Sequence, residues 1–557
     1  MAAEQPVPLL FLPHRSTHDA QNGRPLDTQA RAHASKQGHM KSTRSKTFRF
    51  VPCFSTVRYV GSSGPPETRA LPKPGGSSSN NKATSEKSGA YHPHDSSESE
   101  PRPRGVPARG IGVGCWDPFN SLAVPNLEQD EHFMLHYAFS TTWSAFGESE
   151  RGKRAFAQSW MWRTMENPAT LFAQLLGSST HFILSSSGSM IQSRMITMGL
   201  RWKVQAIKAL RCEIEKYQAS PDATVTDSAL VAVFVLAVHD GFELSPQPEP
   251  HPLSPLATYR DMHIYGRMTF GEEHVKALYT LIERRGGFSH IDQHTFGCVM
   301  PLLDMLYHSR MGSVPRFPCY RRLQKILRTT LWQPDERASR LLGTLGSPFR
   351  PGPSDESLLS VIQLNPNIIE ILAVMAELTV AIDHFCRGGS GTPASLDVLA
   401  NNCDWVSHRL LSTTTYLTPS NDEVNTDQES SHDTGTVMRE ICRLTSLIYL
   451  DMVIFPNPQH AQIKYRHSAT MLPLICGLHR REWNRDGCVA EFLIWATMLG
   501  AIASRFTELH GSYLDLIHVY QVERCSAWGA VELCLKRYLW LDSVCDLPAK
   551  TLWSKAR

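Results

Sequence analysis

The sequence contains none of the short motifs that bind metals or nucleotides. Its 13 cysteines include no C-x2-C pair, and neither an H-E-x-x-H motif nor a calcium-binding loop occurs. The phosphate-binding glycine loops G-x-x-x-x-G-K-[ST] and G-x-G-x-x-G are missing, as is the G-x-S-x-G turn that carries the nucleophile of many hydrolases. The sequence therefore predicts no metal site, no cofactor and no catalytic residues.

Long apolar runs are also missing. The two longest, residues 229–238 and 492–503, are much shorter than the roughly 20 residues that a membrane-spanning helix needs. The apolar stretch at residues 7–12 is interrupted by proline and follows no basic segment, so it lacks the pattern of a secretory signal. We therefore expect a soluble intracellular protein without a membrane partner, in which both longer runs form buried core helices.

The cysteines do not suggest a disulfide framework, because their number is odd and no two are closely spaced. Several lie in apolar helical surroundings, which is typical of free thiols in a reducing compartment. Cys476 and His479 are three residues apart and could share a helix face. No second pair of ligands lies nearby, so a core cysteine beside a helix-end histidine is favoured over a metal site.

Charge is distributed unevenly along the chain. The whole chain carries a net charge of +3, but residues 1–60 contain nine Lys or Arg and only three acids. A basic arm on a near-neutral body is typical of a contact with nucleic acid or with an import receptor. A solvated, disordered tail explains the same charges equally well. The candidate contact residues are Arg31, Lys36, Lys41, Arg44 and Lys46.

Composition divides the chain into four regions. Residues 1–60 form the basic arm, which is predicted to be mostly disordered, and residues 61–114 are a linker rich in Ser, Gly and Pro. A first helical half is expected over residues 115–345 and a second over residues 346–545. Within the second half, residues 418–435 are so polar that they are predicted to be a disordered insertion.

Apolar residues recur at helical spacing after the linker, and no run alternates as strands do. Asn126 is the predicted N-cap of the first helix, with Gln129 closing a capping box. Further helices are expected over residues 152–163, 168–178, 190–218, 227–242, 271–285, 295–310, 318–331, 358–386, 394–412, 436–454, 464–478, 488–508, 512–523 and 526–539. The predicted fold class is all-α, and irregular stacked helix pairs are one arrangement compatible with it.

Four segments also resemble a known family. "DPFNSLAVP" at residues 117–125 leads into a helix that ends near His136 and Tyr137, and "TDSALVAVFVLAVHD" follows at residues 226–240. "HVKALYTLIERRGGF" at residues 274–288 comes next, and "LDMLYHSRMGSVPRFP" at residues 303–318 is the last. In this order and spacing, the segments resemble the fungal-specific transcription factor domain, the helical region that follows the DNA-binding module of fungal zinc-cluster regulators.

The zinc cluster of that family needs six cysteines in a compact pattern, whereas only Cys53 precedes Cys115 here. "QARAHASKQGHMKSTRSKTFRFV" at residues 29–51 instead resembles the basic segment of a branch that lacks the cluster. The resemblance implies a nuclear, non-enzymatic transcription regulator with an all-α regulatory domain. Its expected partners are DNA, bound through the basic arm, and proteins of the transcription machinery or a related regulator.

Two other functions stay open on the sequence. A helical scaffold or interaction protein with no link to DNA would have the same composition. A helical enzyme of specialised metabolism would need clustered acids or a cofactor motif, and neither occurs in the sequence.

Overall fold

The computed structural model describes residues 121–146, 150–186, 189–219, 224–242, 254–297, 299–319, 323, 332–351, 358–388, 390–417, 433–457, 462–482 and 487–556. The predicted disorder of the arm, the linker and residues 418–432 of the insertion lies outside the described residues. So do the D-P-F segment and nearly all of the helix expected over residues 318–331.

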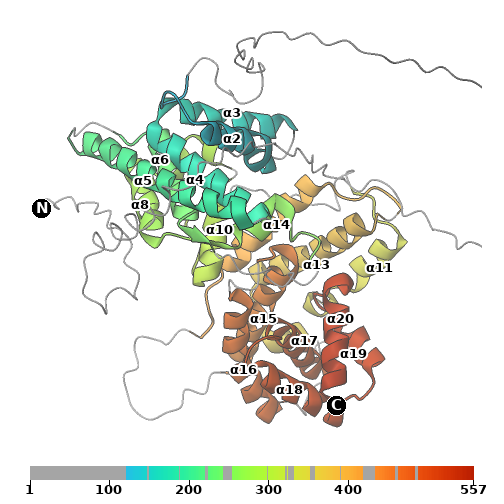
Figure 1. Cartoon of the computed structure of the whole chain (residues 1–557). Coiled ribbons are helices and arrows are strands. Elements are labelled where there is room, and N and C mark those ends of the chain that lie inside the picture. The colour runs from blue at the N-terminus through green and yellow to red at the C-terminus, as the bar shows by residue number, and fades with distance from the viewer. Residues whose placement is uncertain are drawn as a thin grey trace, which may run out of the picture. The chain divides into compact units, whose positions relative to one another are not determined.

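The described part of the chain is helical almost throughout, which confirms the predicted all-α class (Figure 1). Its helices in the first half are α2 (Gln129–Tyr137), α3 (Glu150–Glu166), α4 (Pro168–Ser185), α5 (Ser189–Ala219), α6 (Asp227–Val238), α7 (Met262–Tyr265), α8 (Glu272–Arg284), α9 (Gln293–Phe296) and α10 (Met300–Met311). The second half contributes α11 (Glu336–Thr344), α12 (Leu358–Ile362), α13 (Pro366–Arg387), α14 (Leu396–Leu411), α15 (Thr434–Tyr449), α16 (Ile463–Glu482), α17 (Gly487–Ala503), α18 (His510–Glu523), α19 (Trp528–Leu535) and α20 (Asp542–Lys555).

The two longest apolar runs form core helices, as expected. In α6 every residue from Ser228 to Val238 is buried, and the helix packs between α4 and α8. The side chain of Thr226 caps it by accepting a hydrogen bond from the backbone N–H of Ala229 at 3.2 Å. In α17, every residue from Val489 to Ala503 except Glu491 is buried, and the helix packs against α15, α16 and α18. None of the helices described here combines the length and apolar character that crossing a membrane requires.

Helix α4 extends seven residues beyond the end that its apolar pattern predicts. Its second part is polar in sequence yet buried, and the hydroxyl groups explain how this is tolerated. Ser178 donates to the carbonyl oxygen of Gln174 at 2.8 Å, and Thr180 donates to that of Leu176 at 2.9 Å. Because each hydroxyl is satisfied within its own helix, it can be buried without losing hydrogen bonds.

Helix α14 joins the helices of the two halves, since it packs against α10 from the first half and against α13 and α15 from the second. The colours of Figure 1 follow this order: blue-green and green helices of the first half, then yellow α11 and α13, then orange and red α15–α20. A single antiparallel pair of two-residue strands, β1 (Gly241–Phe242) and β2 (Met268–Thr269), is described besides the helices.

The first helix starts differently from the prediction. Asn126 has φ of 57°, which is left-handed and incompatible with the N-cap geometry, so the predicted cap is wrong. Helix α2 begins at Gln129, and the side chain of Glu131 accepts the backbone N–H of Glu128 at 2.8 Å. The capping interaction therefore comes from the side chain of Glu131 and not from that of Gln129.

Other helices also differ from the helical pattern. The helix expected over residues 295–310 is two helices, because Pro301 allows α10 to start only near Met300, after the turn at Gly297. The helix expected over residues 436–454 ends as a π-helical turn, η8 (Leu450–Ile454). Helices α11 and α20 were not predicted; α20 contains Pro548, which weakens the helical signal of its sequence.

Candidate functional site

A connector between α6 and α8, residues 254–271, lies against helices from both halves. Two adjacent residues in it, Arg260 and Asp261, have left-handed backbones with φ of 51° and 54°. For residues with a Cβ atom, this conformation costs about 1–3 kcal/mol each, so surrounding contacts must hold it in place. Unusual backbone geometry of this kind concentrates at functional and switching sites, which makes the connector the candidate functional site.

The first contact that holds the connector is a buried ion pair. Both carboxylate oxygens of Asp404, on α14, accept from Nη1 of Arg260, at 3.0 and 2.9 Å. The two side chains are only 8% and 9% exposed. Burial opposes the charge of Arg260, but the carboxylate of Asp404 outweighs this effect and raises the pKa of the guanidinium. The pair therefore ties the connector to a helix of the second half.

The second contact joins the connector to the first half through a histidine. Nε2 of His181, on α4, lies 3.1 Å from Oδ2 of Asp261, and its Nδ1 lies 2.8 Å from the hydroxyl of Tyr137. A carboxylate only accepts hydrogen bonds, so Nε2 carries the imidazole proton and Nδ1 accepts from Tyr137. We call His181, Arg260, Asp261 and Asp404 the polar hub.

Residues around the polar hub are also buried and polar. His239 is fully buried, its Nδ1 lies 2.9 Å from the carbonyl oxygen of Val235, and its Nε2 has no hydrogen-bond partner. Burial lowers the pKa of His239 to about 4, so the imidazole is neutral at pH 7. Burial likewise raises the pKa of Tyr265, next to it, well above the usual range. Both groups stay uncharged beside the hub.

Arg310, on α10, holds the far end of the connector. Its guanidinium donates to the carbonyl oxygens of Tyr265 at 3.1 Å and of Gly266 and Met268 at 2.5 Å, and it lies over the ring of Phe270. Burial lowers the pKa of Arg310 to about 10, so it remains a cation at neutral pH. One side chain thus satisfies three backbone carbonyls of the turn.

The polar hub has little access to solvent. His181 is 2% exposed and Asp261 is 7% exposed. A groove of about 340 Å³ between α13 and α14, a void of about 20 Å³ beside Tyr279 and another of about 10 Å³ beside Arg337 are lined by other residues. Within the described residues, no group of three or more His, Cys, Asp or Glu side chains could hold a metal ion. The hub links helices of both halves through buried polar contacts, and its burial hinders reaction with a substrate from solution.

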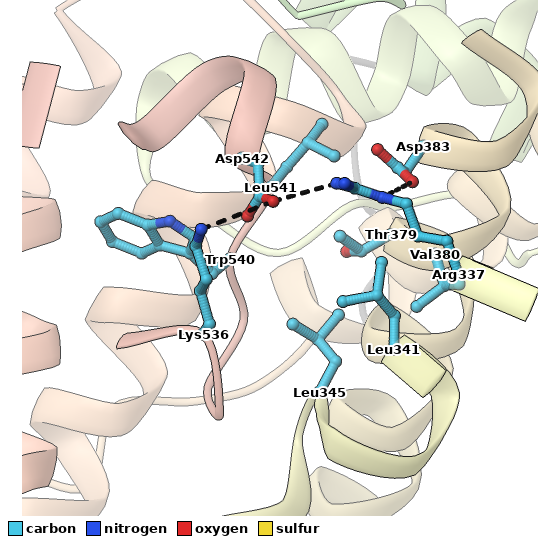
Figure 2. Close-up of a pocket in the computed structure, with 10 residues that line it drawn as sticks. All are labelled: Arg337, Leu341, Leu345, Thr379, Val380, Asp383, Lys536, Trp540, Leu541 and Asp542. Atoms are coloured by element: carbon cyan, nitrogen blue, oxygen red, sulfur yellow. Dashed lines mark hydrogen bonds and ion pairs between the residues drawn. The ribbon is translucent and has the colours of Figure 1, made fainter. Parts of the chain in front are cut away.

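A second ionic centre fastens the C-terminal helix (Figure 2). Arg337, on α11, donates to Asp542 at 3.0 Å and lies 3.4 Å from Asp383, on α13, while Lys536 lies 3.6 Å from Asp542. Apolar side chains, among them Leu341, line the void beneath these charges. The void has room for about one water molecule, which is too small for a ligand. The charged residues above it hold α20 in place through their ion pairs with Asp542.

None of the five candidate contact residues of the arm lies in the described part of the chain. The structure therefore does not test the predicted contact role of these residues, which are Arg31, Lys36, Lys41, Arg44 and Lys46. The structure does describe Cys476 and His479, which lie on α16 and are both half-buried rather than in the core. Sequence reasoning missed all four residues of the polar hub. The charged "YRD" at residues 259–261 between apolar segments was the signal that could have drawn attention to them.

Comparisons with known proteins add no relative to this description. No protein-family model matches the chain, and neither the curated proteins nor the solved structures contain a match to it.

Proposed function

We propose that this protein is a non-enzymatic regulator of transcription, with the helical body as its regulatory domain and the basic arm as its contact with DNA. The proposal places the protein in the nucleus. Partners bound by the helical body would be proteins of the transcription machinery or a related regulator.

The observation that carries the proposal is how two of the resembling segments pack. Asp227, in "TDSAL", pairs with Arg285, in "ERRGGF", at 2.7 Å. After Arg285 the chain turns through Gly286 and Gly287, whose φ angles of 94° and 95° favour glycine. The resemblance therefore rests on residues that interact with each other, and this makes a chance similarity of separate motifs a weaker explanation.

The polar hub supports a regulatory role for the same body. A regulator needs an element whose two conformations differ little in free energy, so that a partner or ligand can favour one of them. The side chains of two strained residues in the connector make buried polar contacts to two different helices, which is the arrangement expected of such an element.

The test is DNA binding by the full chain over a series of salt concentrations, on random and promoter-derived duplexes. The variant replaces Arg31, Lys36, Lys41, Arg44 and Lys46 with alanine. Each lost phosphate contact reduces the slope of log K against log salt by about 0.9, so the loss of five contacts should make the slope shallower by up to about 4.5. A matched control replaces five exposed basic residues of the body, namely Lys208, Arg211, Lys216, Lys276 and Arg284.

Binding that weakens in the arm variant and persists in the body variant supports the proposal. If the full chain binds neither duplex at low salt, direct DNA binding is excluded, and the regulatory role would have to run through a partner protein. If both variants weaken binding equally, the contact is nonspecific attraction to positive charge and the arm has no special role.

A second candidate function is a helical scaffold without a link to DNA. The observation that favours it is a set of strongly exposed apolar side chains on three C-terminal helices: Val522, Leu533 and Leu547 are each at least 70% exposed. Cytosolic location of the intact protein, together with loss of a bound partner after Leu533→Asp, would favour the scaffold over the regulator.

A further inference from the structure

A chain of hydrogen bonds at the end of α10 connects an exposed serine to a buried carboxylate. Ser313 is exposed and follows Gly312, which ends the helix with φ of 67°. Its hydroxyl lies 2.6 Å from Nδ1 of His308. On the other side of the imidazole, Nε2 lies 3.0 Å from the hydroxyl of Tyr279 and 3.3 Å from Oδ1 of Asp304.

The donors and acceptors of this chain follow from the contacts of Tyr279 and Asp304 for a neutral His308. Tyr279 donates its only proton to Asp304 at 2.5 Å, and burial together with the charge of Asp304 raises the pKa of Tyr279 far above neutrality. Whether Nε2 of His308 contacts the oxygen of Tyr279 or Asp304 directly, it must therefore donate a proton. In the neutral imidazole, Nδ1 then carries no proton and accepts the hydrogen bond of the Ser313 hydroxyl at 2.6 Å.

This is the arrangement that activates a serine. A base within hydrogen-bond reach of the hydroxyl, itself oriented by a third group, is the common requirement of nucleophilic catalysis. Asp304 is fixed in turn by the backbone N–H of Phe317 at 3.0 Å. His308 lies in the last turn of α10, and its Nδ1 is 2.6 Å from Oγ of Ser313. The proton of Ser313 therefore has an acceptor within hydrogen-bond reach.

The surroundings of Ser313 suit an electrophile with an apolar group. Met311 and Val314, on either side of it in the chain, are 48% and 46% exposed. Arg466 approaches the same turn: a Cβ atom on Gly312 would lie 3.5 Å from its Nη1. The cation therefore lies near the turn that carries Ser313, with Nη2 donating to the carbonyl oxygen of Ser309 at 3.2 Å.

Beyond the regulatory role, we propose that Ser313 is a nucleophile that takes up a single acyl group from small apolar esters, in a stoichiometric acylation of the protein itself. In the reaction, Oγ of Ser313 forms a bond to the carbonyl carbon while its proton moves to Nδ1 of His308. The ester C–O bond then breaks, and the leaving alkoxide takes the proton from His308, so that an acyl-serine and an alcohol result. Ser313 and His308 touch the reacting atoms, whereas Tyr279 and Asp304 are positioning residues.

The probe for this chemistry is an alkyl fluorophosphonate, whose phosphorus is attacked as the carbonyl carbon would be, with fluoride as the leaving group. The full-length protein contains a matched control, because Ser289 lies 3.2 Å from Nδ1 of His290 and both are exposed. In the described residues, no carboxylate is seen to contact His290. Trypsin separates the two sites, since Ser313 is the only serine of the peptide spanning residues 311–316.

We expect Ser313 of the folded protein to be labelled about 100-fold faster than Ser289, the ordinary size of a general-base effect. Unfolding in urea should abolish the difference, and His308→Gln should reduce labelling of Ser313 to the rate at Ser289. p-Nitrophenyl butyrate, as the ester itself, should release p-nitrophenol in a burst that Ser313→Ala removes and Ser289→Ala retains.

Labelling of Ser313 less than about tenfold faster than Ser289 would overturn the proposal, because the Ser313–His308 bond would then merely complete the end of the helix. Equal rates in folded and urea-unfolded protein would overturn it as well. Neither comparison depends on a substitution, so a folding defect in His308→Gln leaves the test valid.

Discussion

At the scale of single residues, Arg260 and Asp261 are the unusual positions of this protein. Among the non-glycine residues described with positive φ, only these two are adjacent in the chain. Each makes a buried polar contact to a different helix: Arg260 forms an ion pair with α14, and Asp261 accepts a hydrogen bond from α4. Because left-handed backbone is intrinsically unfavourable for both, the stability of this turn depends on contacts with residues far away in the sequence.

Removing one partner of the Arg260–Asp404 pair should be strongly destabilising. Arg260→Met leaves the Asp404 carboxylate buried without its cation, and the expected loss is about 3–5 kcal/mol in the free energy of unfolding. The double variant Arg260→Met with Asp404→Leu should recover much of this loss. Chemical denaturation of the single and double variants measures the coupling. The exposed pair of Arg194 and Asp130 is the control, where Arg194→Ala should cost less than about 1 kcal/mol.

His239 should make the fold sensitive to moderate acid. Its pKa is about 4 in the folded protein because of burial, compared with about 6.5 in the unfolded chain. Between these values only the unfolded chain binds the proton, so stability decreases as the pH falls from about 6.5 to 4, by up to about 3 kcal/mol. His239→Asn keeps a donor for the carbonyl of Val235 and should lose less stability over this range. Identical pH dependence of unfolding for both proteins would contradict the prediction.

The polar hub itself could not be read from the sequence. His181, Asp261 and Asp404 are separated by 80 and 143 positions, and each alone is an ordinary residue of a helix or turn. Their chemistry arises from proximity, which periodicity does not encode. Likewise, Ser313, His308 and Asp304 are close in sequence, but the orientation of the imidazole depends on Tyr279, which comes from another helix.

At the scale of elements, the sequence predicts the apolar helices best. Helices α6 and α17 are recognisable because nearly every residue is apolar and buried. The sequence predicts helix α2 but not its cap. Asn126 is a residue type that favours the N-cap position, yet its backbone is left-handed in the structure. Helix α11, of nine residues, was missed because it is short and largely exposed, so its interaction with α13 does not appear in the periodicity of its own sequence.

Two helical glycines should respond to alanine in opposite directions. A Cβ atom on Gly500, in α17, would lie 2.5 Å from the ring of Tyr513, which is fully buried and donates to the carbonyl of Ser468. Gly500→Ala should therefore lose about 1–3 kcal/mol of stability through overpacking. Gly477, in α16, has open space around its Cα, so Gly477→Ala should gain about 0.5–1 kcal/mol. Thermal unfolding of both variants measures the difference, and a loss in Gly477→Ala would show that the space is not open.

At the scale of the whole molecule, the described helices of the two halves share buried polar contacts. Besides the Arg260–Asp404 pair, a second contact joins the halves: Nε2 of His408, on α14, lies 2.8 Å from the carbonyl oxygen of Phe317. Arg466 of α16 donates to the carbonyl of Ser309, and Ser254 donates to that of Val453. Separating the two halves would break these hydrogen bonds, and each polar group would lose its partner at a cost in free energy. The two halves are separate along the sequence, but the contacts between them contribute to the stability of both.

We therefore expect residues 121–556 to unfold as one cooperative unit. Hydrogen exchange at low concentrations of denaturant gives the free energy and the denaturant dependence of opening for individual amides. Amides of α6 and of α17 should converge on the same values, because α14 and the connector couple the two cores. In Arg260→Met, both sets should become less protected together. Two distinct opening free energies, with only α6 affected by Arg260→Met, would instead mean that the halves are independent domains and that the hub regulates only the first of them.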